Sequence, residues 1–189
     1  MNKSFPLLLL LFIMIISCNQ TDNKTEKIFC NPLNLNYRFQ PGNISYRECA
    51  DPAIVRYRNK FILFASHSSG YWISDDMLTW KHNPVKTLDI IEDYAPDAIV
   101  INDTIYYAGS ASVRKPLWFT TDPLGDNWQQ MPDTLPFPIW DPHFFEDDDG
   151  RRYLYWGCSN VDPVYGVELN SKMQAITEPA VLIEHNPDK

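Results

Sequence analysis

Three aspartates beside prolines recur along the chain. Asp51 and Asp141 each precede a proline and lie 90 residues apart, and Asp97 follows a proline between them. Carboxylates that converge on one site raise one another's pKa, which separates them into acid and base roles. Hydrolysis of a glycosidic bond needs this division of labour. An aspartate beside a proline also commonly caps a turn or starts a strand, so the spacing alone leaves both interpretations open.

The aspartates belong to three similar segments. They read ADPAIVRYRNKFILFAS from Ala50, APDAIVINDTIYYAGS from Ala95 and WDPHFFEDDDGRRYLYWGCS from Trp140. Each segment has an Asp/Pro pair, a short apolar stretch, a polar turn and an aromatic-rich strand that ends in small residues. Turn-forming residues at Asn59, at 102–103 and at 149–150 predict a tight hairpin in each segment.

A second pattern completes each unit. The residues YWISDDMLTW at 71–80 resemble LWFTTDPLGDNW at 117–128, and YGVELNSKM followed by PAVLI gives a weaker third match. The fifteen prolines leave no long window for a helix. Repeats of about 40–50 residues with four short strands are typical of propeller blades. The sequence therefore predicts an all-β fold, a β-propeller with about three blades, and a β-sandwich is the alternative.

In a propeller, the innermost strand of each blade lines a central channel, so equivalent positions face one another. The letters AIV at 53–55 recur at 98–100, which places Asp97 one residue out of register with Asp51 and Asp141. We expect all three aspartates to approach one axial cleft from neighbouring innermost strands.

The three segments resemble the first three blades of glycoside hydrolase family 43, whose inverting enzymes have five-bladed propellers. The resemblance covers residues 47–183, and its most specific element is the third segment, with its Asp-Pro, Phe, acidic Asp-Gly turn and Tyr-Leu strand. It implies an inverting glycosidase that acts on polysaccharides or oligosaccharides containing arabinose, xylose or galactose, without a cofactor.

The resemblance also implies roles for the aspartates. Asp51 matches the general base that activates the attacking water, and Asp141 matches the residue that orients the general acid and raises its pKa. Asp97 falls in an element that walls the sugar pocket, with Tyr94 in place of the family's Trp. Asp97 is therefore expected to contact substrate without being catalytic.

The family's general acid is a Glu in an EGP-like or EGA-like element at the start of the fourth blade. The chain has no such element, and Glu178 lies in ITEPAVLI, which resembles the strand that closes the third blade. We therefore expect an incomplete propeller without its general acid. The alternative is a non-catalytic, surface-anchored sugar-binding propeller. A related fructan-acting family is disfavoured, because its Asn-Asp-Pro-Asn start is absent.

Aromatic residues give further candidates. Trp72, together with Trp118 and Trp140, could stack on a sugar ring, although side chains at strand spacing also commonly fill the core between blades. Trp72 is expected to bind substrate. His143, which follows the third Asp-Pro, could face the channel or support Asp141.

The net charge of −8 argues against a nucleic-acid partner and is consistent with a site for neutral sugars. No metal site is expected. Cys30, Cys49 and Cys158 lack zinc-type spacing, and residues 147–150 lack the alternating ligands of a calcium loop, which favours a hairpin turn. A bridge between Cys30 and Cys49 and two reduced thiols both remain open.

The first residues indicate export. Residues 7–16 are uninterruptedly apolar, about half of the roughly 20 residues that span a bilayer, which is typical of a signal peptide. Ser17 before Cys18 resembles a bacterial lipobox. This implies a lipoprotein-type signal peptide over 1–17, acylation of Cys18, a polar tether over 18–27 and the propeller over 28–189. The alternative is an ordinary secretory signal with a chance cysteine. We expect a bacterial lipoprotein anchored through its lipid, facing the periplasm or the cell surface.

Overall fold

The computed structural model describes residues 49–87, 94–158 and 162–185, all within the second of two compact units, Leu33–Lys189. The signal peptide over 1–17, Cys18 and the tether over 18–27 lie outside the described residues, so the lipid anchor stays a prediction. None of the residues within the described ranges forms a helix long and apolar enough to span a bilayer.

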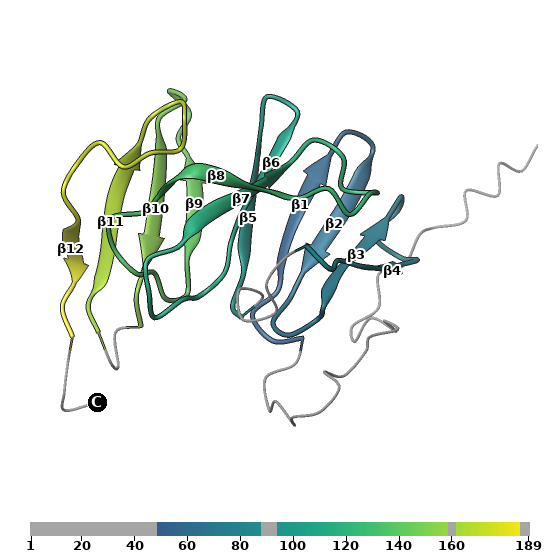
Figure 1. Cartoon of the computed structure of the whole chain (residues 1–189), viewed down its shortest axis with the longest axis horizontal. Helices are drawn as coiled ribbons and strands as arrows, with labels where there is room; N and C mark the ends of the chain where they lie inside the picture. The colour runs from purple at the N-terminus through teal and green to yellow at the C-terminus, as the bar shows by residue number, and fades with distance from the viewer. Residues whose placement is uncertain (1–48, 88–93, 159–161, 186–189) are drawn as a thin grey trace, which may run out of the picture. The chain divides into compact units, whose positions relative to one another are not determined.

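The described strands form three sheets, each of four consecutive antiparallel strands (Figure 1). This confirms the predicted all-β fold with propeller-like blades. We call the sheets blades 1, 2 and 3. Blade 1 contains β1 (Ala53–Tyr57), β2 (Lys60–Phe64), β3 (Gly70–Ser74) and β4 (Lys81–Pro84); blade 2 contains β5 (Asp97–Ile101), β6 (Thr104–Ala108), β7 (Pro116–Thr120) and β8 (Gln129–Thr134); blade 3 contains β9 (His143–Glu146), β10 (Arg152–Trp156), β11 (Val164–Leu169) and β12 (Ala180–Ile183).

The first two strands of each blade are joined by the predicted hairpins. Positive φ angles at Asn102 (46°), Asp103 (60°) and Gly150 (81°) turn the chain within two of them. These residue types tolerate the left-handed region better than others. Arg58 in the blade 1 hairpin donates from Nε to Oδ1 of Asp103 at 2.8 Å, so neighbouring hairpin tips are linked. Residues 147–150 form a turn, in which the Gly150 amide donates to the Asp147 carbonyl.

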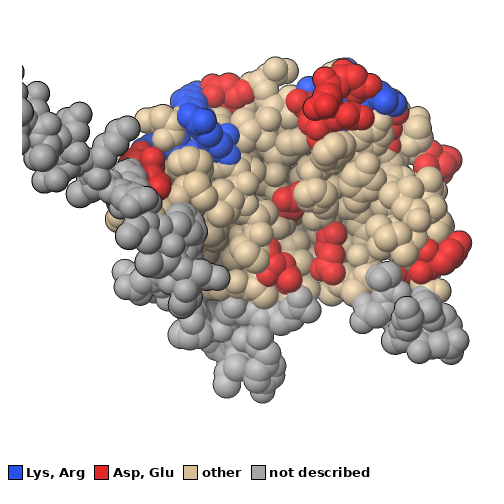
Figure 2. Space-filling view, turned by 180° about the vertical axis from the view of Figure 1, so that it is seen from behind, with Lys and Arg blue, Asp and Glu red and all other residues tan. Residues whose placement is uncertain are grey.

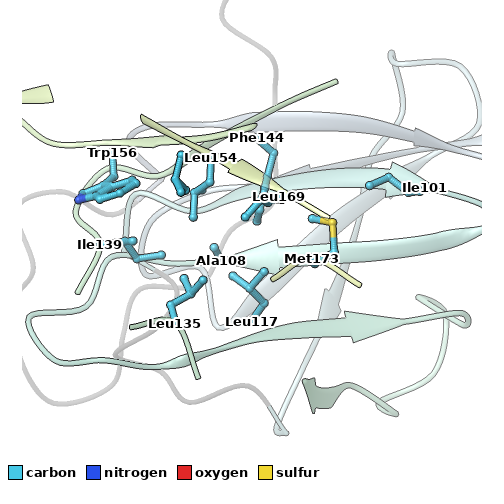
Figure 3. Close-up of a cluster of buried hydrophobic side chains, with 11 residues drawn as sticks. Ile101, Ala108, Leu117, Leu135, Ile139, Phe144, Leu154, Trp156, Leu169 and Met173 are labelled. Atoms are coloured by element: carbon cyan, nitrogen blue, oxygen red, sulfur yellow. The ribbon is translucent and has the colours of Figure 1, made fainter. Parts of the chain in front are cut away.

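Neighbouring blades are joined face to face by buried aromatic and aliphatic side chains. Between blades 1 and 2, the ring of Phe64 lies 5.3 Å from Tyr107, and within blade 1 it lies 5.0 Å from Tyr71. Between blades 2 and 3, side chains from both sheets form a second cluster that includes Leu117, Leu154 and residues of the connecting segment (Figure 3). The first strands β1, β5 and β9 contact one another in sequence, and this order brings the start of each blade to one place.

Candidate active site

The chain makes the same bend before the first strand of each blade. Asp51, Ala95 and Asp141 each precede a proline and have φ angles of 52°, 41° and 49°. Because residues before proline favour extended backbone, this left-handed conformation is sustained by the surrounding structure. Such backbone strain commonly occurs at functional sites.

The structure corrects the predicted register of the second repeat. The first strands begin at Ala53, Asp97 and His143, so Ala95 is the equivalent of Asp51 and Asp141. Asp97 lies two residues beyond that position, not one. Ala53 is the first residue of β1, whereas Ala98 is the second residue of β5, so the repeated letters AIV occupy different positions on the two strands. Each strand has five residues and ends at a two-residue turn, and counting back from that turn makes Asp97 the equivalent of Ala53.

The three bends surround one hollow of about 290 Å³, which we call the acidic pocket. This confirms that the three aspartates converge; their roles in chemistry stay predictions. The face shown in Figure 2 carries most of its Lys and Arg along its upper edge, whereas acidic atoms near its centre lie among uncharged residues. The acidic pocket is lined by Asp51, Pro52, Ala53, Ala95, Pro96, Asp97, Asp141, Pro142 and His143.

Two buried serines, which sequence analysis did not single out, fix these bends. Ser66 Oγ accepts a hydrogen bond from the Ala95 amide at 2.8 Å and donates to Oδ2 of Asp51 at 3.3 Å. Ser110 Oγ accepts from the Asp141 amide at 2.9 Å. Each serine follows the second strand of one blade and holds the bend of the next. The sequence did contain a signal for these serines, because Ser66 and Ser110 are the small residues that end the aromatic-rich stretch of the first and second repeats.

Asp97 connects blade 2 to blade 3. Its Oδ2 accepts from the Phe144 amide at 2.6 Å and lies 3.1 Å from Nδ1 of His143. His143 therefore pairs with Asp97, and it lines the acidic pocket together with Asp141. Burial raises the pKa of Asp97, and the Phe144 amide and the facing His143 partly offset that rise. Asp97 lines the acidic pocket, but its carboxylate is already engaged in joining two blades.

Replacing Asp97 with Asn should change how stability depends on pH. A carboxyl whose pKa is higher in the folded protein stabilises the fold below its ordinary value of 3.8, and this contribution is lost as the pH rises through the raised pKa. Asp97→Asn should therefore reduce the loss of stability over that window, measured as urea midpoints from pH 3.5 upward. Asp148→Asn, an exposed hairpin substitution, serves as the control, and an unchanged slope in Asp97→Asn would contradict the prediction.

The prediction that Trp72 contacts substrate is wrong. Its side chain is fully buried and lies against the His82 ring at 5.1 Å, within a cluster that includes Leu63. Trp118 is also buried, in the cluster between blades 1 and 2. Both occupy the third strand of a blade, where side chains fill the core. Trp140, in the segment that leads to Asp141, is 42% exposed.

Glu178 does not line the acidic pocket. It is exposed and lies two residues before β12, the outermost strand of blade 3. Three strand spacings separate β12 from β9, which corresponds to about 14 Å. No glutamate among the described residues lines the acidic pocket.

Comparison with known proteins finds similarity in structure alone. No family model and no curated protein matches the sequence. A thermostable family-43 glycoside hydrolase matches at a TM-score of 0.56 and 19% identity, over 85% of this chain and 58% of that one. A xylan β-1,4-xylosidase from Bacillus halodurans C-125 matches at 0.55 and 19%, over 80% and 35%. A family-43 endo-arabinanase from Bacillus licheniformis matches at 0.52 and 19%, over 76% and 58%.

The chain thus spans 58% or less of the length of these three structures. At such identities the likeness establishes the fold alone. The similarity to the thermostable family-43 enzyme nevertheless extends over 85% of the chain, whose described part forms three four-stranded sheets in the order that the repeats predicted. The described part of the chain therefore has the β-propeller fold of the family-43 glycoside hydrolases.

Proposed function

We propose that the chain acts as a glycoside hydrolase on polysaccharides or oligosaccharides that contain arabinose, xylose or galactose, with inversion at the anomeric carbon. The observation that carries this proposal is the convergence of Asp51 and Asp141 on the acidic pocket from equivalent bends. The solved structures of similar fold include a xylosidase and an endo-arabinanase, which supports a pentose-containing substrate.

Asp51 is the proposed general base. Its side chain is exposed, so water can reach it, and the hydroxyl of the buried Ser66 donates to one of its oxygens. That contact orients the carboxylate, and its exposure to solvent would let it take a proton from the attacking water. Inversion requires base and acid to lie about 6.5–9.5 Å apart, with room for this water.

Asp141 is the proposed modulator of the general acid. The Ser110 hydroxyl fixes its backbone, and Asp141 lines the same pocket as Asp51, where the proposal places it beside the leaving group. The proposal assigns no acid to the described residues, because no described glutamate lines the acidic pocket. That same observation favours a second candidate function, a propeller that binds sugar without cleaving it.

An aryl glycoside separates the two functions, because its leaving group needs little protonation. We expect the chain to release nitrophenol from 4-nitrophenyl arabinofuranoside or xyloside, and to cleave the corresponding disaccharides about 10²–10⁴-fold more slowly, since an acid contributes that much. Proton NMR should show the first released sugar with inverted configuration. Retained configuration would contradict inversion, and binding without any release would favour the sugar-binding propeller.

We also propose that the protein is exported and anchored through an acylated Cys18. The support is the apolar run before Ser17 and the polar stretch after Cys18. Mass spectrometry of the N-terminal peptide from membranes tests this proposal directly. A peptide that begins at Cys18 and carries acyl chains supports it, and an unmodified Cys18 contradicts it.

A further inference from the structure

His143 lines the acidic pocket, and the proposed function gives it no role. It is the first residue of β9, and its side chain is 67% exposed. Its partner Asp97 comes from the first strand of the neighbouring blade, and the Asp97 side chain is only 13% exposed. A largely buried carboxylate therefore holds an exposed imidazole at the edge of the pocket.

The hydrogen bonds of Asp97 assign the proton of this imidazole. Oδ2 of Asp97 accepts from the Phe144 amide at 2.6 Å and lies 3.1 Å from Nδ1 of His143. A carboxylate oxygen has lone pairs for more than one donor, so the neutral imidazole carries its proton on Nδ1 and donates it to Asp97. The second ring nitrogen is then an acceptor. Nε2 of His143 thus presents a lone pair.

Nε2 is the part of the ring that remains available to a ligand. Within the described ranges, the polar contact of His143 runs through Nδ1 to Asp97, and Nε2 has no hydrogen-bond partner there. Because the two nitrogens lie on different edges of the ring, fixing Nδ1 against Asp97 directs Nε2 away from it. The ring is both oriented and exposed, which is the condition for specific contact with a ligand in the pocket.

The other side chains of the acidic pocket share this acceptor character. Asp51, Asp97 and Asp141 offer carboxylate oxygens, which only accept hydrogen bonds when ionised. The three prolines of the lining have no N–H. No Lys or Arg occurs among the described residues that line the pocket. A ligand must therefore bring the donors itself, and sugar hydroxyl groups are such donors.

We infer that Nε2 of His143 accepts a hydrogen bond from one hydroxyl group of the sugar in the acidic pocket, with the ring held in place by Asp97. The inference rests on the proposed function and adds a specificity to it. The sugar must carry a free hydroxyl group at the position that His143 contacts. A sugar methylated or acetylated at that position is rejected, because an ether or ester oxygen has no proton to donate.

Calorimetric titration with methyl xyloside, methyl arabinofuranoside and their monodeoxy and deoxyfluoro analogues tests the inference. For the sugar that binds more tightly, removal of the contacted hydroxyl group should weaken binding by about 2–10-fold, the net worth of one hydrogen bond. Fluorine at that position should restore nothing, because it cannot donate to Nε2. An analogue that regains affinity with fluorine would identify a protein donor instead, and would contradict an acceptor at His143.

Two substitutions separate contact with the sugar from the link between the blades. His143→Asn keeps a side-chain N–H near the position of Nδ1, and with it the bond to Asp97, but lacks the atoms that extend to Nε2. It should bind the parent sugar about 2–10-fold more weakly and lose nothing further with the critical deoxy analogue. His143→Gln places an amide oxygen near the position of Nε2 and should regain part of the affinity.

Urea midpoints show whether the link to Asp97 survives, and His143→Asn should unfold like the unchanged chain. If its midpoint falls, the comparison of parent and deoxy sugar within that variant still decides, because both are bound by the same protein. Phe145→Asn is the matched control, since Phe145 is 44% exposed on β9 and does not line the acidic pocket. It should bind every sugar like the unchanged chain.

The inference is overturned if His143→Asn still distinguishes the parent sugar from the critical deoxy analogue as the unchanged chain does. It is also overturned if His143→Asn binds the parent sugar with full affinity. In both cases the proposed function stands wherever aryl glycosides are cleaved. If no sugar is bound or cleaved, the proposed function fails with the inference.

Discussion

Asp51→Asn should lower the rate of aryl arabinofuranoside or xyloside cleavage by about 10²–10⁴-fold, the contribution of a general base. Asparagine has nearly the shape of aspartate and can still accept the hydrogen bond from Ser66, but it cannot take a proton from water. The loss should appear in kcat, with KM changed little, because the base acts on water and not on the sugar. Release of nitrophenol, followed by absorbance, measures both constants.

Two further variants separate a missing base from a disturbed fold. Asp51→Gly suits the φ angle of 52° at this position and opens space at the pocket, so azide should restore cleavage and give a glycosyl azide of inverted configuration. Asp148→Asn, in the exposed hairpin of blade 3, should leave the rate unchanged. Full activity in Asp51→Asn would remove Asp51 from the mechanism.

Local sequence chemistry was enough to predict the blades. Turn residues such as Asn59 and Gly150 set the hairpins, and alternating apolar and aromatic runs set the strands. The X-Pro bends then followed at the start of each repeat, and with them the convergence of Asp51 and Asp141. The hairpins depend on residues close in sequence, and the convergence follows because each repeat builds the same unit, which is why the repeat was informative.

The register of Asp97 could not be obtained in the same way. Matching letters at 53–55 and 98–100 suggested an offset of 45, whereas the paired strands place Asp97 opposite Ala108 and Ala53 opposite Phe64. The hairpin turn, not residue identity, determines register. The partnership of Asp97 with His143 depends in turn on how two sheets pack, and a single repeat contains no information about its neighbour.

Trp72 and Trp140 show that the burial of a side chain could not be predicted from the sequence either. Both are tryptophans next to strands rich in aromatic residues, yet one is fully buried and the other is 42% exposed. Trp72 lies within β3, where packing covers it, and Trp140 lies in a connecting segment beside a bend. Residue type and spacing alone do not distinguish these situations, because the covering groups come from other parts of the chain.

Gly157→Ala should reduce the free energy of unfolding by about 3–5 kcal/mol, the combined scale of backbone strain and overpacking. Gly157 follows β10 and has a φ angle of +123°, and an added Cβ would lie 2.1 Å from the Pro163 carbonyl oxygen. That oxygen belongs to the backbone entering β11, so relief requires the strand to move. Urea unfolding followed by tryptophan fluorescence measures the loss.

Gly150→Ala isolates the cost of the backbone conformation. Gly150 also has a positive φ angle, +81°, but an added Cβ there meets nothing within 4 Å. It should lose only about 1–2 kcal/mol, the ordinary penalty of the left-handed region. Equal losses at the two glycines would show that β11 yields easily near Pro163. A larger loss at Gly157 would show that the backbone between Pro163 and the segment of Trp140, to whose carbonyl the Gly157 amide donates, resists displacement.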